Sequence, residues 1–115
     1  MQYLLLIYDE PGAYDSLSAK DRQELYAEYD RLSSDLVERG ALVGANPLES
    51  VPAARTVRLR SGERLVTDGP FAETKETLGG YYLIDVESMD EALDWAARIP
   101  SARFGPVEVR PVRPE

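Results

Sequence analysis

The stretch Tyr3-Leu4-Leu5-Leu6-Ile7-Tyr8 decides the fold of this chain. It is a continuous apolar run rich in Leu and Ile, which is typical of a β-strand buried on both faces at the centre of a sheet. The next residues, Asp9-Glu10-Pro11-Gly12, end the strand because Pro and Gly interrupt regular structure. The sequence therefore predicts a central strand near the start of the chain, and both faces of that strand need a cover.

Capping residues and apolar spacing predict two amphipathic helices. Ser18 is a candidate N-cap and Gly40 follows the last turn, which places the first helix over residues 19–39. Its apolar positions recur at helical spacing, at Leu25, Tyr29, Leu32 and Leu36. Ser88 and Glu91 form a capping box for the second helix, which Pro100 ends. The residues predicted to face inward from it are Ala92, Leu93, Ala96 and Ile99.

The remaining strands complete a ferredoxin-like order. Strands are predicted over residues 41–48, 80–86 and 107–111, and residues 56–60 and 64–67 form a hairpin around Ser61-Gly62-Glu63. The order strand, helix, strand, hairpin, strand, helix, strand is a βαββαβ plan with an added hairpin. We therefore expect one α+β domain over residues 1–115, close to the commonest size of a single domain.

The sheet face that the two helices leave uncovered indicates a contact with a partner. Two helices can cover only one face of the sheet, yet the first strand is apolar on both sides. An apolar sheet face that stays uncovered is a typical contact surface for another subunit. We therefore expect a homodimer built sheet to sheet, which is a dimeric α+β barrel.

Charge and composition exclude several classes of function. The net charge of −8 argues against nucleic-acid binding, which needs a basic surface. The chain has neither cysteine nor histidine, so thiol and imidazole nucleophiles, bases and metal ligands are absent. Proton chemistry falls to carboxylates, tyrosine or lysine. We expect no cofactor and no metal, because Asp9, Glu10 and Asp15 lack the spacing of a calcium loop and are interpreted as solvated charge.

The start of the chain predicts no membrane association. It lacks a basic leader and a small-residue cleavage site, and its apolar run is too short to span a bilayer. Together with the absence of cysteine, this suits a cytoplasmic protein. Cytoplasmic localisation is the resulting expectation.

The charge-dense segment Asp68-Gly69-Pro70-Phe71-Ala72-Glu73-Thr74-Lys75-Glu76 links two predicted strands. Its first half has a structural explanation as a turn, with Phe71 as a core anchor beneath the loop. The functional alternative makes Asp68 a base and Lys75 the support for a developing oxyanion at the mouth of a pocket. Glu73 and Glu76 are then candidate substrate-binding residues. The competing interpretation of these charges is an exposed, salt-bridged turn.

Three tyrosines add candidates for the same pocket. Tyr8 ends the central strand and is the third candidate catalytic residue, because its hydroxyl is placed to orient a substrate oxygen. Tyr81 and Tyr82 are candidate substrate-binding residues. Neighbouring residues of a strand face opposite ways, so one of these two side chains should point to the helices and the other to the opposite face. The structural alternative treats all three as core residues with a hydroxyl at the rim.

These motifs resemble a known family. Asp68-Gly69-Pro70-Phe71, the following Glu73-Thr74-Lys75-Glu76 and Leu78-Gly79-Gly80-Tyr81-Tyr82 are similar to the DGPF group of YCII-related proteins, and the likeness spans nearly the whole chain. The resemblance implies a ferredoxin-like dimeric fold. It also implies a histidine–aspartate pair in catalysis, of which only an aspartate can carry over here, with Asp68 as the natural position.

The resemblance leaves two classes of function open. One is a small-molecule enzyme, or a vestigial enzyme, with a carboxylate, lysine and tyrosine pocket. The other is a non-catalytic ligand-binding or interaction module, because related domains occur fused to sigma factors and a sigma-factor association follows by analogy. A buried pocket would favour the first class, and a flat exposed motif would favour the second.

Overall fold

The computed structural model describes residues 1–115. Along the chain the elements are β1 (Gln2–Asp9), α1 (Ala19–Glu38), β2 (Leu42–Pro47), η1 (Val51–Ala53), β3 (Arg55–Arg60), β4 (Glu63–Asp68), β5 (Thr77–Asp85), α2 (Met89–Ala97), η2 (Pro100–Arg103) and β6 (Val107–Pro111), where η marks a 3₁₀ helix. This is the predicted ferredoxin-like βαββαβ order with an added hairpin.

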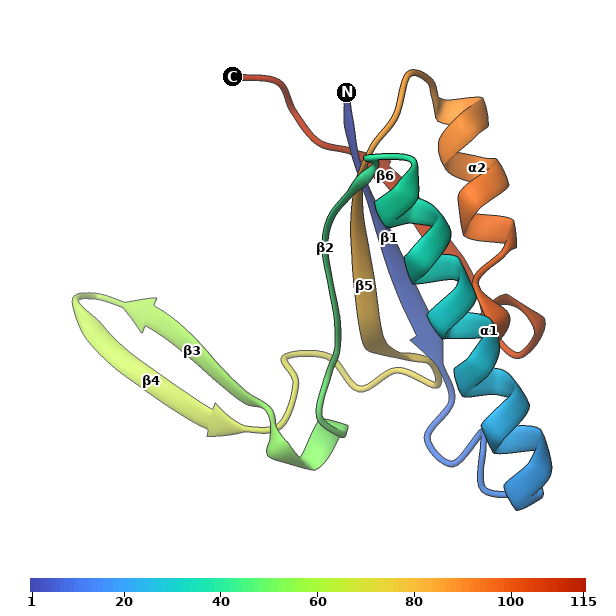
Figure 1. Ribbon diagram of the computed structural model, residues 1–115. Coiled ribbons are helices and arrows are strands. Elements are labelled where there is room, and N and C mark those ends of the chain that lie inside the picture. The colour runs from blue at the N-terminus through green and yellow to red at the C-terminus, as the bar shows by residue number, and fades with distance from the viewer.

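Four strands form one antiparallel sheet in the order β2-β5-β1-β6, with β1 in the interior. Leu5 of β1 lies opposite Tyr82 of β5 on one side and opposite Val109 of β6 on the other. Both helices cover the same face of this sheet (Figure 1). The sheet of a single chain is open, and it does not close into a barrel.

Alternation along the strands separates the two faces of the sheet. Tyr3, Leu5 and Ile7 of β1 are buried against the helices, as are Tyr82 and Ile84 of β5. From the helices, the core receives Leu32, Leu36, Ala92 and Ala96. The apolar stripe that the sequence predicted for α1 therefore faces the sheet.

The helix caps lie where the sequence predicted them. The Ser18 hydroxyl accepts a hydrogen bond from the backbone N–H of Asp21 at 3.0 Å. At α2, the Ser88 hydroxyl accepts from the Glu91 N–H, and the Glu91 carboxylate accepts from the Glu87 N–H. Each cap satisfies backbone donors that have no partner within the helix. No helix is long and apolar enough to cross a membrane.

The opposite face of the sheet has no cover within the chain. Leu4, Leu6, Tyr81 and Leu83 point to this open face and are half-buried among their neighbours in the sheet. At its β6 edge, Glu108 and Arg110 form an ion pair at 2.6 Å, as the alternation of the last strand suggested. The subunit contact predicted for this face stays a prediction.

The hairpin is a separate two-stranded sheet. β3 and β4 pair only with each other, and the hairpin projects from the side of the main sheet that lies opposite the helices (Figure 1). The turn between them uses positive φ angles at Ser61 and Gly62. We call residues 55–68 the arm.

Three sequence-based details differ from the structure. β5 begins at Thr77 rather than Gly80, because two adjacent glycines hid the start of the strand. Phe71 is 78% exposed and is not a core anchor, since no element of the chain packs over its loop. Leu93 is exposed as well, because α2 packs on the sheet through Ala92 and Ala96.

Candidate functional site

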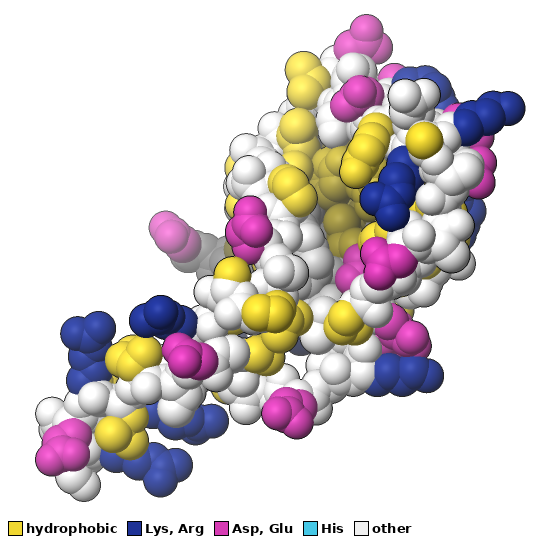
Figure 2. All heavy atoms as spheres, turned by 90° about the horizontal axis from the view of Figure 1, so that it is seen from below, with side chains coloured by type: hydrophobic (Ala, Val, Ile, Leu, Met, Phe, Trp, Pro, Cys, Tyr) yellow, Lys and Arg dark blue, Asp and Glu magenta, His cyan; other side chains and the backbone are white.

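A cavity of roughly 1160 Å³ lies between α1 and the end of the sheet where β1 finishes. Its floor is formed by sheet residues that include Ile7, Ala45, Gly80 and Tyr82, and its wall by Leu25, Tyr26, Tyr29 and Ser33 of α1. Figure 2 views this end of the molecule and shows hydrophobic side chains inside a hollow with charged side chains around it. Apolar walls with a few polar groups are typical of small-molecule sites.

A smaller hollow of roughly 260 Å³ lies elsewhere on the surface, beside the ends of both helices. Most of its charged side chains are paired: Arg39 lies 3.5 Å from Glu91, and Arg98 contacts Asp35 and stacks on the Trp95 ring at 5.0 Å. The hollow is small and has a single apolar side chain, Trp95, in its lining, so the larger cavity is the candidate site.

Asp9 supplies a carboxylate to the cavity. A β-bulge follows Ile7, so that Tyr8 pairs with Leu78 and Gly79 has no partner in the ladder. The Asp9 carboxylate lies over Gly79: a Cβ atom on that glycine would be 3.2 Å from Asp9 Oδ2. Bulges are known to redirect side chains beside functional sites. Here the bulge and the bare glycine make room for the carboxylate.

Tyr14 is held at the cavity by contacts on both its backbone and its ring. The guanidinium of Arg22, in the first turn of α1, donates a 2.9 Å hydrogen bond to the Tyr14 carbonyl. The Phe104 ring packs edge-to-face against the Tyr14 ring, with centroids 5.6 Å apart. The loop after β1 is therefore tied to α1 and to the segment after α2.

Two phenols in the cavity are kept in their neutral form. Burial raises the pKa of Tyr14 above its usual range, and the nearby negative charge of Asp9 raises it further. Burial also raises the pKa of Tyr29. The Tyr29 hydroxyl donates a hydrogen bond to Ser101 Oγ at 2.8 Å. Near neutral pH both phenols are hydrogen-bonding groups rather than anions.

A further hydroxyl pair lines the inner wall. Ser33 Oγ of α1 and the Tyr82 hydroxyl of β5 lie 3.1 Å apart, and both residues border the cavity. The site therefore combines the Asp9 carboxylate, neutral phenols and a serine hydroxyl with apolar walls, and Glu10, Asp30 and Glu49 also border it. Such a set can accept and donate protons and can orient the oxygens of a small molecule. No group of three or more acidic side chains lies close enough together to hold a metal ion.

Comparison with known proteins identifies the family. The family model described as YCII-related domain matches residues 1–115. The chain belongs to the YCII-related family. It is 40% identical over 114 residues to an uncharacterized protein, R00369, of Rhizobium meliloti (strain 1021). The match covers 97% of this chain and 92% of R00369.

A solved structure shares the fold of this YCII-related protein. It is the 5-chloro-2-hydroxyhydroquinone dehydrochlorinase TftG from Burkholderia phenoliruptrix AC1100, in complex with 2,5-dihydroxybenzoquinone. The TM-score is 0.57 at 17% sequence identity, and the match covers 98% of this chain and 94% of that one. The similarity supports the ferredoxin-like assignment.

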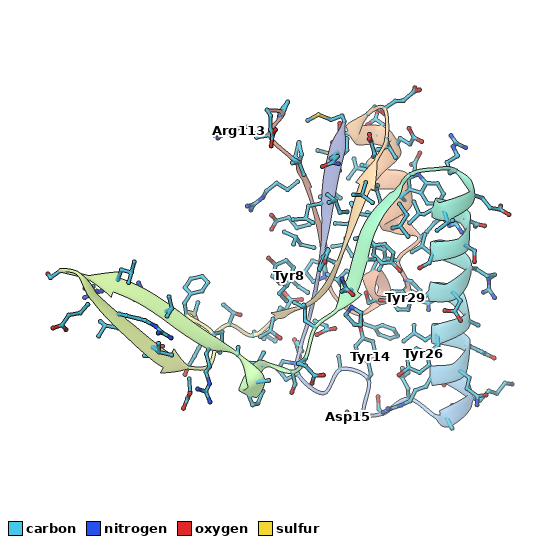
Figure 3. All side chains as sticks on the ribbon, turned by 60° about the vertical axis from the view of Figure 1, so that its left-hand side comes forward. Tyr8, Tyr14, Asp15, Tyr26, Tyr29 and Arg113 are labelled. Carbon is cyan, nitrogen blue, oxygen red and sulfur yellow. The ribbon has the colours of Figure 1, made fainter.

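In this YCII-related protein none of the three predicted catalytic residues, Asp68, Lys75 and Tyr8, lines the cavity. Tyr8 points to the sheet face away from α1, whereas Tyr14 and Tyr29 lie between the sheet and the helix (Figure 3). The Asp68 side chain is 91% exposed and lies 3.6 Å from Arg55 of the arm. Neither Asp68 nor Tyr8 borders the cavity. Their catalytic role stays a prediction.

Lys75 connects the charge-dense loop to the cavity rim. Its ammonium lies 3.2 Å from the carboxylate of Glu10, which borders the cavity, although the Lys75 side chain is itself 82% exposed. Glu73 is exposed, and Glu76 offers its backbone carbonyl to the Thr74 hydroxyl at 2.5 Å. Neither glutamate borders the cavity, so their predicted contact with substrate is not visible in the single chain.

Tyr81 and Tyr82 both border the cavity, from opposite faces of β5. Tyr82 is buried toward the helices, and the Tyr81 hydroxyl accepts a 2.9 Å hydrogen bond from the Asn46 side chain. Sequence reasoning missed Tyr14, and it assigned Tyr29 to the core because Tyr29 falls in the apolar stripe of α1. The signal for Asp9 was present, since it ends the central strand, but it was interpreted as solvated charge.

Proposed function

We propose that this YCII-related protein is a small-molecule enzyme that moves a proton on a flat, oxygenated substrate held between α1 and the sheet. The observation that carries the proposal is the convergence of the Asp9 carboxylate with two neutral phenols, Tyr14 and Tyr29, on one large cavity. Clefts that gather titratable groups with shifted pKa values are the usual places for acid–base chemistry.

Asp9, Tyr14 and Tyr29 each have a separate role in this proposal, set by the hydrogen bonds that each can make. The Asp9 carboxylate accepts a proton from a substrate hydroxyl, or from a carbon next to a carbonyl. The Tyr14 hydroxyl then donates a hydrogen bond to the oxygen on which negative charge develops. Tyr29 already donates its proton to Ser101, so it presents oxygen lone pairs that can receive a substrate hydroxyl. Because the chain has no histidine, a carboxylate is the natural base.

The cavity walls define the substrate class. Ile7, Leu25 and Ala45 offer apolar surface, and Tyr26 adds an aromatic ring at the rim. A flat ring with several oxygens fits these walls and the three polar groups. The complex of TftG with 2,5-dihydroxybenzoquinone supports a ligand of this kind.

The first experiment measures binding of 2,5-dihydroxybenzoquinone by thermal shift and calorimetry. We expect Asp9→Asn to weaken binding by about tenfold or more, since a charged hydrogen-bonding group is lost. Asp68→Asn is the matched control, an identical change on an exposed carboxylate, and should leave the affinity unchanged. The reverse pattern would favour the charge-dense loop, with Asp68, Lys75 and Tyr8 as the functional set. A failure of the wild-type protein to bind would show that the substrate class is wrong.

The second experiment separates catalysis from simple binding. Incubation with 5-chloro-2-hydroxyhydroquinone, followed by absorbance and chloride release, should show turnover by the wild-type protein that Asp9→Asn abolishes. Binding without turnover would instead support a ligand-binding module, including one linked to sigma-factor-dependent transcription.

A further inference from the structure

The hydroxyl pair on the inner wall of the cavity holds a hydrogen that has no acceptor in the chain. Ser33 Oγ of α1 and the Tyr82 hydroxyl of β5 lie 3.1 Å apart, and neither hydroxyl has another hydrogen-bond partner. Each hydroxyl brings one hydrogen, and the bond between them uses one of the two, whichever group donates it. Because Tyr82 is only 6% exposed and both residues border the cavity, a molecule in the cavity is the acceptor that the other hydrogen can reach.

Both hydroxyls are held by rigid elements. The Tyr82 ring belongs to the buried core, and its strand β5 lies between β1 and β2 in the sheet. Ser33 lies one helical turn after Tyr29, on the face of α1 that lines the cavity. A donor that is fixed in this way loses little freedom when it binds an oxygen, which is the usual property of a preorganised binding site.

The cavity floor beside Tyr82 carries no large side chain. Gly80 lies two residues before Tyr82, on the same face of β5, and it is buried. It pairs with Ile7 of β1 on one side and with Pro47 of β2 on the other, and all three residues border the cavity. A glycine between two apolar side chains leaves a flat surface on which a planar ring can lie.

This part of the floor lies between two polar ends of the cavity. Along β1, Ile7 lies between Leu5, which pairs with Tyr82, and Asp9, which supplies the carboxylate. A ring on the floor therefore has the carboxylate at one end and the hydroxyl pair at the other. An oxygen at each end of such a ring can be bound at the same time.

We propose that Ser33 and Tyr82 form a second oxygen site, which donates a hydrogen bond to a carbonyl or hydroxyl oxygen on the side of the substrate ring opposite Asp9. The inference rests on the proposed function, because it takes a flat oxygenated ring as the ligand of this cavity. It narrows the substrate class to rings that carry oxygens at opposite positions. Ser33 and Tyr82 are then substrate-binding residues that determine specificity.

A matched pair of ligands tests the oxygen site. Hydroquinone and 4-methylphenol have nearly the same shape, but in 4-methylphenol a methyl group replaces the second oxygen. The measured quantity is the preference for hydroquinone, defined as the dissociation constant of 4-methylphenol divided by that of hydroquinone. Chemical-shift titrations by NMR supply both constants, including weak ones. A comparison of this ratio between variants cancels the general difference in hydrophobicity between the two ligands.

Ser33→Ala combined with Tyr82→Phe removes both hydroxyls and leaves no unpaired partner behind, so the fold should be retained. The preference for hydroquinone should fall about fivefold or more, because a hydrogen bond to the second oxygen is lost. Either single change leaves one hydroxyl with a free hydrogen and should lower the preference less. Ser34→Ala combined with Tyr3→Phe removes the same two groups from residues that do not border the cavity, and should leave the preference unchanged. A Ser33→Ala/Tyr82→Phe variant with the wild-type preference would overturn the proposal.

Asp9→Asn separates the oxygen site from the proposed base. This change leaves both hydroxyls in place, so the preference for hydroquinone should persist while the affinity for 2,5-dihydroxybenzoquinone falls. If the affinity stays unchanged in Asp9→Asn and the preference is lost in Ser33→Ala/Tyr82→Phe, the oxygen site is supported and the base is refuted. The opposite pair of results refutes the oxygen site alone. A wild-type protein that binds neither hydroquinone nor 2,5-dihydroxybenzoquinone would overturn both.

Discussion

The hydroxyl of Tyr29, on the first helix, donates a hydrogen bond of 2.8 Å to the hydroxyl of Ser101, on the 3₁₀ turn after the second helix. Ser101 is only 1% exposed, so this bond crosses the interior. It fixes one of the two phenols of the cavity and joins the two helical segments of the fold. The same hydrogen bond therefore contributes to the stability of the fold and to the geometry of the cavity.

We expect Ser101→Ala to lower the free energy of unfolding by about 1–2 kcal/mol, because the Tyr29 hydroxyl loses its partner in a partly buried place. This corresponds to a fall of roughly 4–8 °C in the melting temperature, measured by calorimetry. Ser34→Ala is the control, since Ser34 is exposed on α1, the helix that carries Tyr29, and alanine is a better helix former than serine. A similar loss in both variants would show that the hydrogen bond is not the cause.

The two half-buried phenols, Tyr14 and Tyr29, predict a loss of stability in alkaline solution. The pKa values of Tyr14 and Tyr29 are raised in the folded chain, whereas both phenols ionise near pH 10 when unfolded. Above about pH 10 the unfolded chain therefore releases protons that the folded chain retains, and the free energy of unfolding falls as pH rises. Below that pH both states keep these protons, and the two phenols add no pH dependence.

Tyr14→Phe should flatten this alkaline fall, which melting temperatures recorded between about pH 7 and pH 11 would show. Tyr26→Phe is the matched control, because the Tyr26 side chain is 63% exposed. A spectrophotometric titration gives an independent measure: Tyr14→Phe should remove one late-ionising tyrosine. An unchanged titration curve above pH 10 would contradict the assignment.

Gly79 is predicted to position the Asp9 carboxylate. A methyl group on this glycine would lie 3.2 Å from Asp9 Oδ2, so Gly79→Ala should displace the carboxylate from the cavity. Because the displaced group is a flexible side chain, we expect the free energy of unfolding to change by less than about 1 kcal/mol. Affinity for 2,5-dihydroxybenzoquinone should fall several-fold. The double variant Gly79→Ala/Asp9→Asn should bind no more weakly than Asp9→Asn alone, whereas additive losses would separate the two residues.

Local sequence patterns were sufficient to predict the main sheet and both helices. The apolar run of β1, the serine caps and the apolar stripe of α1 each act within a few residues, and the structure has an element at each of them. The arm was predicted as a hairpin for the same reason. The sequence did not predict that the arm is separate from the main sheet. Pairing of β3 with β4 is local, whereas packing of the arm on the rest of the chain depends on residues far away in the sequence.

The cavity depends on contacts that no short pattern records. Asp9, Tyr14, Tyr29 and Ser101 meet only after the chain has folded around the first helix. Tyr29 falls in the apolar stripe, so spacing alone assigned it to the core. The bulge at Gly79 leaves no signal beyond a pair of glycines, yet it determines where the Asp9 carboxylate lies. The charge-dense loop is conspicuous in the sequence because its charges are adjacent, but its Asp68 is almost fully exposed.

The end of β1 that carries Asp9 depends on a second glycine, Gly105. A Cβ atom at this position would lie 2.4 Å from the backbone oxygen of Tyr8, which is too close for any real contact. Gly105→Ala must therefore move backbone, and we expect a cost of about 1–3 kcal/mol in the free energy of unfolding, measured with urea. Gly44→Ala is the control, because no atom lies within 4 Å of the added methyl group. Since the strain falls on the residue before Asp9, ligand affinity should drop together with stability in Gly105→Ala. A variant with wild-type stability would show that the end of β1 is more yielding than its contacts indicate.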